Sequence, residues 1–385
     1  MLGYCLNVHP TQTLAEVAAA LRGPVRVVKS RVSPDAPLPV GLRLSAEAAA
    51  DPVAAAALLG RIFAEEGYLA YTMNGFPYGP FHGTPVKEAV YEPDWTTPER
   101  RRYTADLAAV MAALVPEGEI ATISTVPGGF APKAQGRAAE IADGLLHMVA
   151  DLVALERATG RTVALALEPE PWCLLDTTAD AIAFFRDHLF TDAAAARLAA
   201  SADLSVAAAR DALPRHLGLC LDVCHMAVAY EAPGPTLRAL AGAGVPIHKL
   251  QLSAALRVER LDDAARTRLA AFRDAIYLHQ VVVRAADGTM RRFLDLPEAL
   301  AARDLDPAGE WRVHFHLPVF AAPIPPLGST RDVLERVLAL HRDRPIARHL
   351  EVETYTWDVL PAEFRQHDVA DGIAKEIAWV SQELC

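Results

Sequence analysis

Residues 163–168 read Val-Ala-Leu-Ala-Leu-Glu, a short apolar run that ends in a carboxylate. Alternate side chains of a β-strand point to the same side, so Glu168 shares a face with Ala164 and Ala166, while the two leucines face the other way. If the leucines pack against helices, Glu168 faces the mouth of a barrel of parallel strands. Barrel enzymes hold their catalytic residues at this end of the strands.

Three later segments have the same form. They are Leu-Asp-Val-Cys-His at 221–225, Leu-Gln-Leu-Ser at 250–253 and Leu-Glu-Val-Glu-Thr at 350–354. The same alternation gives Asp222, Gln251 and Glu353 inward-facing positions, and Lys249 shares the face of Gln251. We therefore expect polar side chains from four strands to meet at one barrel mouth.

The rest of the chain alternates strand patterns with helix patterns. Strand-like runs occur at 3–9, 40–44, 69–73, 120–125, 163–168, 217–222, 247–253, 312–316 and 349–354. Helical patterns occur at 12–22, 46–66, 98–114, 134–158, 178–189, 234–242, 330–342 and 368–383. This alternation predicts βαβ units and a parallel sheet, closed as a (β/α)8 TIM barrel of the α/β class.

The nine strand candidates exceed by one the number that a TIM barrel needs. The excess lies between Gln251 and Glu353, where Ala-Asp-Gly at 286–288 is a hairpin turn signal. We predict that residues 254–326 form an insertion between the late strands, with 312–316 either as a strand of its own or as a late barrel strand. Long excursions at a barrel mouth are typical of substrate lids.

Composition limits the class of protein. The 385 residues are 52% hydrophobic, which suits one long barrel or two medium domains, and the absence of a linker pattern favours a single domain, 1–385. The net charge of −11 disfavours nucleic acid and anionic membranes as partners. The sequence lacks a signal-peptide pattern, an apolar stretch of about 18 residues and paired cysteine spacings. We expect a cytoplasmic protein that binds a small polar metabolite, with a homo-oligomer left open.

The strand-end residues suit a metal ion. Carboxylates of Glu168, Asp222 and Glu353, with the amide oxygen of Gln251, fit one hard or borderline divalent ion, either Mn²⁺ or Mg²⁺, with Zn²⁺ as the alternative. Such an ion polarises a carbonyl or hydroxyl and acidifies the adjacent C–H or O–H, so that a neighbouring Glu removes the proton. For each acid taken singly, a helix cap or a pair with arginine is the alternative role.

The order Glu, Asp-x-x-His, Gln, Glu resembles the xylose isomerase-like TIM-barrel superfamily of sugar isomerases, epimerases and related lyases. The resemblance implies that Glu168 and Glu353 are metal ligands and paired acid/base groups. It implies that Asp222 and Gln251 complete the ligand set and that His225 contacts substrate or metal. Glutamine in place of histidine at the third ligand is similar to the hydroxypyruvate isomerase and inosose dehydratase branches.

Longer motifs resemble the EboE family of metabolite-traffic proteins over nearly the whole chain. They are Tyr71-Thr-Met-Asn-Gly-Phe-Pro-Tyr-Gly79, Phe81-His-Gly-Thr-Pro-Val-Lys87, Tyr277-Leu-His-Gln280, His314-Phe-His-Leu-Pro318 and His349-Leu-Glu-Val-Glu-Thr-Tyr-Thr-Trp357. The family name implies a role in secondary metabolism, in a small gene cluster beside prenyltransferase-like and hydrolase-like proteins, and it fixes no reaction.

Further residues are candidates for the site. Those assigned to substrate binding are Asn7, His9, Asn74, Phe76, His314, His316 and Trp357. We assign His225 and Lys249 to catalysis beside the two glutamates; Lys249 either neutralises an enediolate or phosphate or pairs with a neighbouring acid. The histidines at 314 and 316 are either ligands or hydrogen-bonded core residues, and His279 is expected to belong to the packing of the insertion.

Three functions compete at this point. The leading hypothesis is a divalent-metal-dependent isomerase, epimerase or lyase that acts on a small hydroxy-carbonyl, sugar or cyclitol-like metabolite. The second is a binding or traffic protein that keeps the barrel mouth without turnover. The third, an apurinic-endonuclease-like phosphodiesterase, shares the fold, but it requires more metal-binding histidines and a basic surface, which the net charge of −11 opposes.

Overall fold

The computed structural model describes residues 1–323, 325–361 and 368–385. Eight strands close into a barrel in the order β1-β13-β7-β6-β5-β4-β3-β2, and every neighbouring pair is parallel. The strands are β1 (Leu2–Cys5), β2 (Leu38–Arg43), β3 (Tyr68–Asn74), β4 (Ile120–Thr125), β5 (Thr162–Leu167), β6 (Leu217–Asp222), β7 (Ile247–Leu252) and β13 (His349–Val352). The predicted TIM barrel is confirmed.

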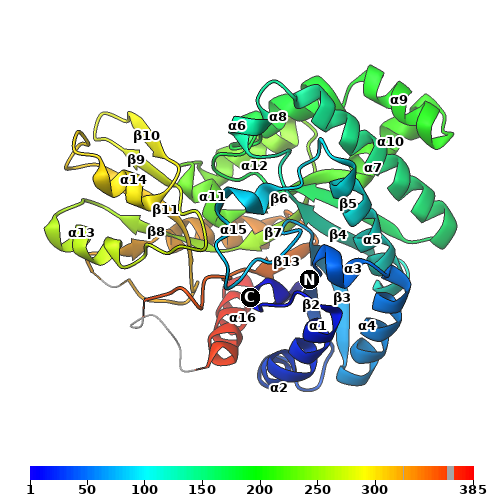
Figure 1. The fold of residues 1–385 in the computed structure, drawn as a ribbon, viewed down its shortest axis with the longest axis horizontal. Coiled ribbons are helices and arrows are strands. Elements are labelled where there is room, and N and C mark those ends of the chain that lie inside the picture. Colours follow the sequence, from blue (N-terminus) through cyan, green and yellow to red (C-terminus); the bar gives the residue numbers. More distant parts are fainter. Residues whose placement is uncertain (324, 362–367) are drawn as a thin grey trace.

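Helices in the connections surround the barrel (Figure 1). They are α1 (Leu14–Ala20), α2 (Arg26–Val32), α3 (Ala46–Ala49), α4 (Pro52–Glu66), α5 (Pro98–Leu114), α6 (Ala131–Ala134), α7 (Ala138–Thr159), α8 (Thr178–Phe184), α9 (Asp192–Ala202), α10 (Val206–His216), α11 (Val223–Val228), α12 (Pro233–Gly242), α15 (Arg331–Asp343) and α16 (Val369–Leu384). The leucine faces of the strands, including Leu165 and Leu167, belong to the main hydrophobic core. This is the packing that the alternating pattern predicts.

Helix starts follow their capping signals in part. The hydroxyl of Thr177 and the carboxylate of Asp180 form a reciprocal capping box at α8, a pairing for which the Thr-x-x-Asp spacing is suited. Thr97 precedes Pro98 at the start of α5 but makes no side-chain cap. Ser329 and Asp332 have the spacing of a capping box, but α15 begins after Thr330 and has no side-chain cap.

A second sheet lies between β7 and β13 in the sequence. Its five strands run in the order β10-β9-β11-β8-β12: β8 (Ala254–Val258), β9 (Val281–Arg284), β10 (Met290–Phe293), β11 (Glu310–Leu317) and β12 (Gly328–Ser329). Helices α13 (Asp263–Ala270) and α14 (Leu296–Ala301) belong to the same segment. The predicted strand at 312–316 is therefore part of the insertion, and the sheet projects to one side of the barrel (Figure 1).

Candidate active site

Three carboxylates meet at the C-terminal ends of barrel strands. Glu168 directly follows β5, Asp222 is the last residue of β6, and Glu353 directly follows β13. All three side chains are buried, and one oxygen of each lies within 4.8 Å of the others. The sequence pattern predicted this meeting, because parallel strands bring their C-terminal ends to one edge.

Asp222 also begins the next helix. Its Oδ1 accepts hydrogen bonds from the backbone N–H of His225, at 3.1 Å, and from the hydroxyl of Ser253, at 2.7 Å. The cap starts α11 and thereby brings the ring of His225 close to the same carboxylate, with Nε2 3.9 Å from Oδ2. Oδ2 of Asp222 is buried and has no hydrogen-bond partner among the described residues. A buried oxygen of this kind is suited to bind a cation.

Gln251 offers a second unpaired oxygen. Its amide nitrogen donates to Oδ1 of Asn74 at 2.9 Å, which orients the side chain. Its Oε1 is buried and, within the described chain, accepts no hydrogen bond. Three carboxylates and a free amide oxygen fit the divalent ion that the sequence predicts, since hard cations prefer oxygen ligands.

Burial and mutual repulsion govern the charges of the three acids. Burial, reinforced by Asp222, raises the pKa of Glu353 to about 8. Burial, with Glu353 close by, raises the pKa of Glu168 well above its usual range. Burial alone would also raise the pKa of Asp222, but interactions with His225 and His316 outweigh it and lower that pKa. The cluster thus holds protons that a bound cation would displace.

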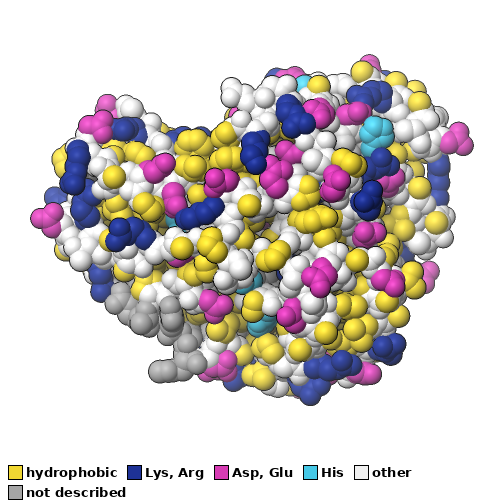
Figure 2. Space-filling view, viewed as in Figure 1, with side chains coloured by type: hydrophobic (Ala, Val, Ile, Leu, Met, Phe, Trp, Pro, Cys, Tyr) yellow, Lys and Arg dark blue, Asp and Glu magenta, His cyan; other side chains and the backbone are white. Residues whose placement is uncertain are grey.

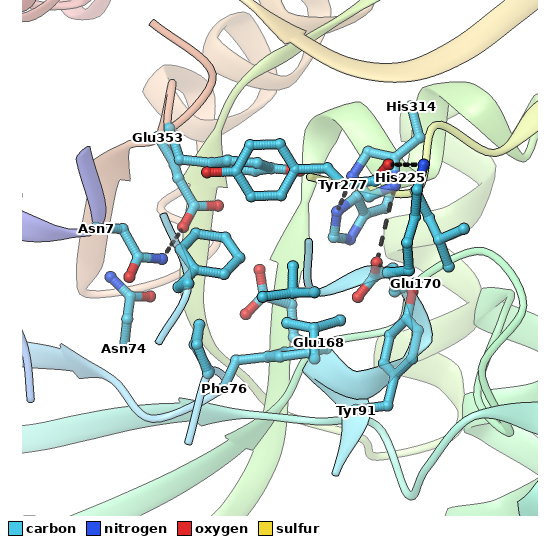
Figure 3. A pocket seen from close by; sticks show the side chains of 17 residues that line it. Asn7, Asn74, Phe76, Tyr91, Glu168, Glu170, His225, Tyr277, His314 and Glu353 are labelled. Atoms are coloured by element: carbon cyan, nitrogen blue, oxygen red, sulfur yellow. Dashed lines mark hydrogen bonds and ion pairs between the residues drawn. The ribbon is translucent and has the colours of Figure 1, made fainter. Parts of the chain in front are cut away.

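Glu168 and Glu353 line a cavity of about 60 Å³. Asn7, Asn74 and Glu353 line one side, and Glu170, His225 and His314 line another, with Glu168 between them (Figure 3). Aromatic rings complete the wall, namely Phe76, Phe81, Tyr91, Tyr277 and Tyr355. Apolar walls around a few convergent polar groups are typical of a small-molecule site.

Asn7 holds Glu353 in place. Its amide nitrogen donates to Oε1 of Glu353 at 2.7 Å, as Figure 3 shows. The other carboxylate oxygen of Glu353 is left for a ligand or a proton. Asn7 and Asn74 therefore lie at the cavity, where the sequence placed them, and so does Phe76.

Two predicted substrate contacts lie elsewhere. The hydroxyl of Tyr4 lies 2.5 Å from Nε2 of His9, and the two rings stack. Trp357 is buried against α16, where a Cβ added to Gly372 would lie 2.4 Å from the indole ring. Neither His9 nor Trp357 is one of the described residues that line the cavity.

Lys249 forms a buried ion pair instead of facing the cavity. Its Nζ lies 2.6 Å from Oε2 of Glu351, and both side chains have 0% exposure. The same Nζ donates to Oδ1 of Asn74 at 2.9 Å, and that oxygen also accepts from Gln251 and Ser124. Of the two roles left open by the sequence, this geometry supports the pair with a neighbouring acid.

The predicted histidines separate into two groups. His225 and His314 line the cavity, with their Nε2 atoms 3.0 Å apart. His316 is fully buried, and its Nδ1 lies 2.7 Å from the carbonyl oxygen of Glu353. Burial lowers the pKa of His316 to about 4 and lowers that of His314 well below its usual value. His279 instead bonds to the carbonyl of His314 and pairs with Asp274 within the insertion.

Sequence reasoning missed a polar group on the far wall. The hydroxyl of Tyr91 donates to Oε1 of Glu170 at 2.9 Å, and the amide of Gln280 donates to the hydroxyl of Tyr91 at the same distance. Burial raises the pKa of Glu170 to about 7. The only signal for Glu170 is its position two residues after Glu168 in Leu-Glu-Pro-Glu-Pro. Tyr91 lies in a short 3₁₀ turn far from any strand end, and no sequence pattern marks it.

Charges of both signs are mixed on one face of the molecule. On the face shown in Figure 2, Lys and Arg side chains are intermixed with Asp and Glu side chains and form no continuous basic patch. None of the described helices has the length and apolar character that a membrane span requires.

Comparison with solved structures defines the class of the fold. A xylose isomerase-like TIM barrel protein from Mycobacterium smegmatis, solved with magnesium, is 11% identical, with a TM-score of 0.50; the match covers 100% of this chain and 96% of that one. D-allulose 3-epimerase from Methylomonas sp., solved with D-allulose, is 12% identical over 99% of this chain and 96% of its own, with a TM-score of 0.47. The 3-keto-D-glucoside 4-epimerase of E. coli is 12% identical over 99% and 98%, with a TM-score of 0.44.

The fold is that of a xylose isomerase-like TIM barrel. No family model matches the sequence, and no curated protein matches it. At these identities the likeness concerns the fold alone, so the function must be argued from the site.

Proposed function

We propose that the protein is a divalent-metal-dependent isomerase, epimerase or lyase that acts on a small hydroxy-carbonyl, sugar or cyclitol-like metabolite. One observation carries the proposal: Glu168, Asp222 and Glu353 lie buried together at the barrel mouth, and Glu168 and Glu353 line a cavity there. Three carboxylates in one buried place are costly unless a cation or protons balance them.

The first part of the proposed mechanism concerns the ligands. Glu168, Asp222, Gln251 and Glu353 would hold one divalent ion, Mn²⁺ or Mg²⁺ by ligand hardness, with Zn²⁺ as the alternative. When bound, that ion polarises a carbonyl or hydroxyl oxygen of the substrate and acidifies the adjacent C–H.

The second part concerns proton transfer by the chain. Glu353 takes or gives the proton through the carboxylate oxygen that Asn7 does not bind, and Glu168 serves the opposite side of the substrate. His225 donates its Nδ1 hydrogen to the carbonyl of Pro169, 2.9 Å away, so its Nε2 is available on the cavity side. The aromatic wall gives the reacting groups an apolar surrounding, which strengthens the electrostatic interactions inside the site.

We propose further that the insertion acts as a lid. Its residues Tyr277, Leu278 and His314 line the cavity. Lys87, which follows β3, joins it to the barrel: Nζ lies 2.7 Å from Oδ2 of Asp295 and donates to the carbonyl of Tyr277 at 2.6 Å. This contact would keep the lid closed over a bound ligand.

A carrier without turnover remains the competing function, and the metabolite-traffic label of the EboE family, which fixes no reaction, is compatible with it. That kinship is itself a proposal. It is supported by the position of the five shared motifs, each of which contributes a residue to the cavity wall: Asn74, Phe81, Tyr277, His314 and Glu353.

The proposed function is tested with a panel of aldoses, ketoses and inososes, each incubated with metal-loaded protein and followed by NMR. We expect a new isomer or dehydration product with wild type. Glu168→Gln and Glu353→Gln should retain an oxygen ligand but lower turnover by about 10² to 10⁴. A panel member that binds tightly yet gives no product with wild type would identify a carrier instead.

A further inference from the structure

Glu170 places a carboxylate on the cavity wall that the proposed reaction does not use. It lies two residues after Glu168 in the loop that follows β5, and Figure 3 shows it across the cavity from Glu353. A carboxylate buried among aromatic rings is costly unless hydrogen-bond donors or a ligand surround it. The contacts of its two oxygens therefore indicate what it binds.

One oxygen of Glu170 is already bound within the protein. Its Oε1 accepts the hydroxyl hydrogen of Tyr91 at 2.9 Å. The amide nitrogen of Gln280 donates to the same hydroxyl at 2.9 Å and to the carbonyl oxygen of Pro171 at 3.2 Å. Because a carbonyl oxygen only accepts, the amide nitrogen must lie on this side, and the single hydrogen of Tyr91 is left for Glu170. These contacts fix the orientation of the carboxylate.

The other oxygen of Glu170 is left for a ligand. None of the described residues donates a hydrogen bond to Oε2, since Nδ1 of His314 lies 2.7 Å from Oε1 of Gln280 and 3.7 Å from Oε1 of Glu170. Glu170 lines the cavity, and its side chain is 10% exposed. An ionised carboxylate only accepts hydrogen bonds, so a ligand must meet Oε2 with a donor.

Within the described lining of the cavity, no cation is free to bind an anion. Lys87 is the only lysine or arginine in this lining. Its Nζ donates to Oδ2 of Asp295 at 2.7 Å and to the carbonyl oxygens of Tyr277 and Asp274 at 2.6 and 3.3 Å, which uses all three of its hydrogens. His314 adds no positive charge, because burial holds its pKa well below its usual value.

Negative charge dominates the same space. The three carboxylates at the barrel mouth outweigh the charge of the single divalent ion proposed for them, and Glu170 adds a fourth carboxylate. A phosphate or carboxylate group of a ligand would face this charge with no free cation to offset the loss of its hydration. An uncharged ligand avoids this cost.

We propose that Glu170 selects an uncharged polyol by accepting a hydroxyl hydrogen at Oε2, and that the cavity rejects phosphorylated and carboxylate-bearing compounds. A site built to bond a substrate hydroxyl rejects the analogue that lacks it, because the polar group of the site is then left unpaired. The inference names the substrate class of the proposed function and rests on it for the use of this cavity. It holds for a carrier as well, because it concerns binding.

The test is calorimetric binding to metal-loaded protein at pH 8, above the pKa of about 7 that burial gives Glu170. The probes are D-fructose, D-glucose and myo-inositol, each paired with its phosphate monoester. We expect at least one uncharged probe to bind, and to bind about tenfold or more tightly than its ester. Glu170→Gln keeps an oxygen for Tyr91 but removes the charge, so it should weaken the uncharged probe about tenfold and strengthen the ester by a similar factor. Glu140→Gln, which neutralises an exposed carboxylate on α7, should change neither affinity.

Monodeoxy analogues of the bound probe separate recognition by Glu170 from support of the cavity wall. In wild type, one analogue should bind about tenfold more weakly than the probe, and in Glu170→Gln the same deletion should cost little more, because the two changes remove one contact. Glu170→Gln that weakens the probe and all its analogues by the same factor would show a structural role and overturn the proposal.

The proposal would also be overturned by an ester that binds wild type as tightly as its parent, or by a panel in which no uncharged probe binds. Should Glu170→Gln not fold, the crystal structure of wild type with the bound probe decides: a hydroxyl oxygen within about 3.2 Å of Oε2 supports the proposal, and a longer distance for every hydroxyl refutes it. Turnover of a phosphorylated sugar would support the proposed function and overturn this inference. Selective binding of an uncharged polyol without turnover would do the reverse.

Discussion

Lys249→Met tests whether this lysine supports the fold or the chemistry. Lys249 and Glu351 are both fully buried, 2.6 Å apart, and Oε1 of Glu351 has no hydrogen-bond partner among the described residues. Removing the ammonium leaves a buried carboxylate with only the amide of Asn74, at 2.9 Å, for a partner. Breaking a buried pair from one side costs about 3–5 kcal/mol, so the free energy of unfolding should fall by that amount.

The double variant Lys249→Met, Glu351→Gln is the matched control. It removes the unpaired charge while it keeps the shape and the contact to Asn74, so most of the lost stability should return. The assay is guanidinium unfolding of wild type, both single variants and the double variant at pH 7. The reasoning fails if Lys249→Met unfolds within about 1 kcal/mol of wild type. An unchanged stability joined to a large loss of turnover would instead assign Lys249 to catalysis.

Three further predictions follow from the charges and the lid. Burial raises the pKa of Glu353 to about 8 in the cation-free protein, so a divalent ion that binds there displaces a proton. The affinity for the ion should therefore rise about tenfold per pH unit up to pH 8 for each proton released. Calorimetry in buffers of different ionisation enthalpy counts the released protons, and an affinity that does not change with pH would contradict the prediction. Burial raises the pKa of Glu376 to about 8, so the folded state keeps a proton that the unfolded state loses above about pH 4.5, and stability falls by about 1.4 kcal/mol per pH unit until pH 8. Glu376→Gln should reduce the measured slope by that amount, because Glu168, Glu170 and Glu353 keep their own contributions. An equal slope in both proteins would show that Glu376 contributes nothing to it. Lys87→Met should weaken ligand binding more than it lowers the melting temperature, and unchanged ligand affinity would argue against the lid.

The barrel and its carboxylates were predictable from the sequence because both depend on the alternation of side chains along a β-strand, in which every second residue faces the same side. Leucine faces alternate with inward residues, and the inward residue at each strand end is polar, so Glu168, Asp222 and Glu353 were found without knowledge of any contact. The same pattern misled for Lys249. The alternation of side chains tells which face of a strand a residue is on, but not how far along the barrel axis it lies. Lys249, two residues before Gln251, lies in the barrel interior with Glu351 and not at the mouth.

Other parts of the site depend on contacts that no local pattern encodes. Tyr91 reaches Glu170 from a turn 79 positions earlier, and Gln280 joins them from the insertion. His314 and His316 stood out as alternate polar residues in an apolar strand. Their meeting with His225 required the tertiary arrangement of β11 against the barrel.

The most direct test of the central claim, proton transfer by paired glutamates at a metal-bound substrate, is exchange of substrate hydrogen with solvent. Metal-loaded protein is incubated in D₂O with each sugar or cyclitol that it binds, and the carbon-bound hydrogens are followed by proton NMR and mass spectrometry. We predict deuterium at a carbon next to the carbonyl with wild type, and a loss of about 10² or more in its rate with Glu353→Gln. The claim would be contradicted if metal-loaded wild type, saturated with a tightly bound ligand, formed no isomer and exchanged none of the ligand's carbon-bound hydrogens.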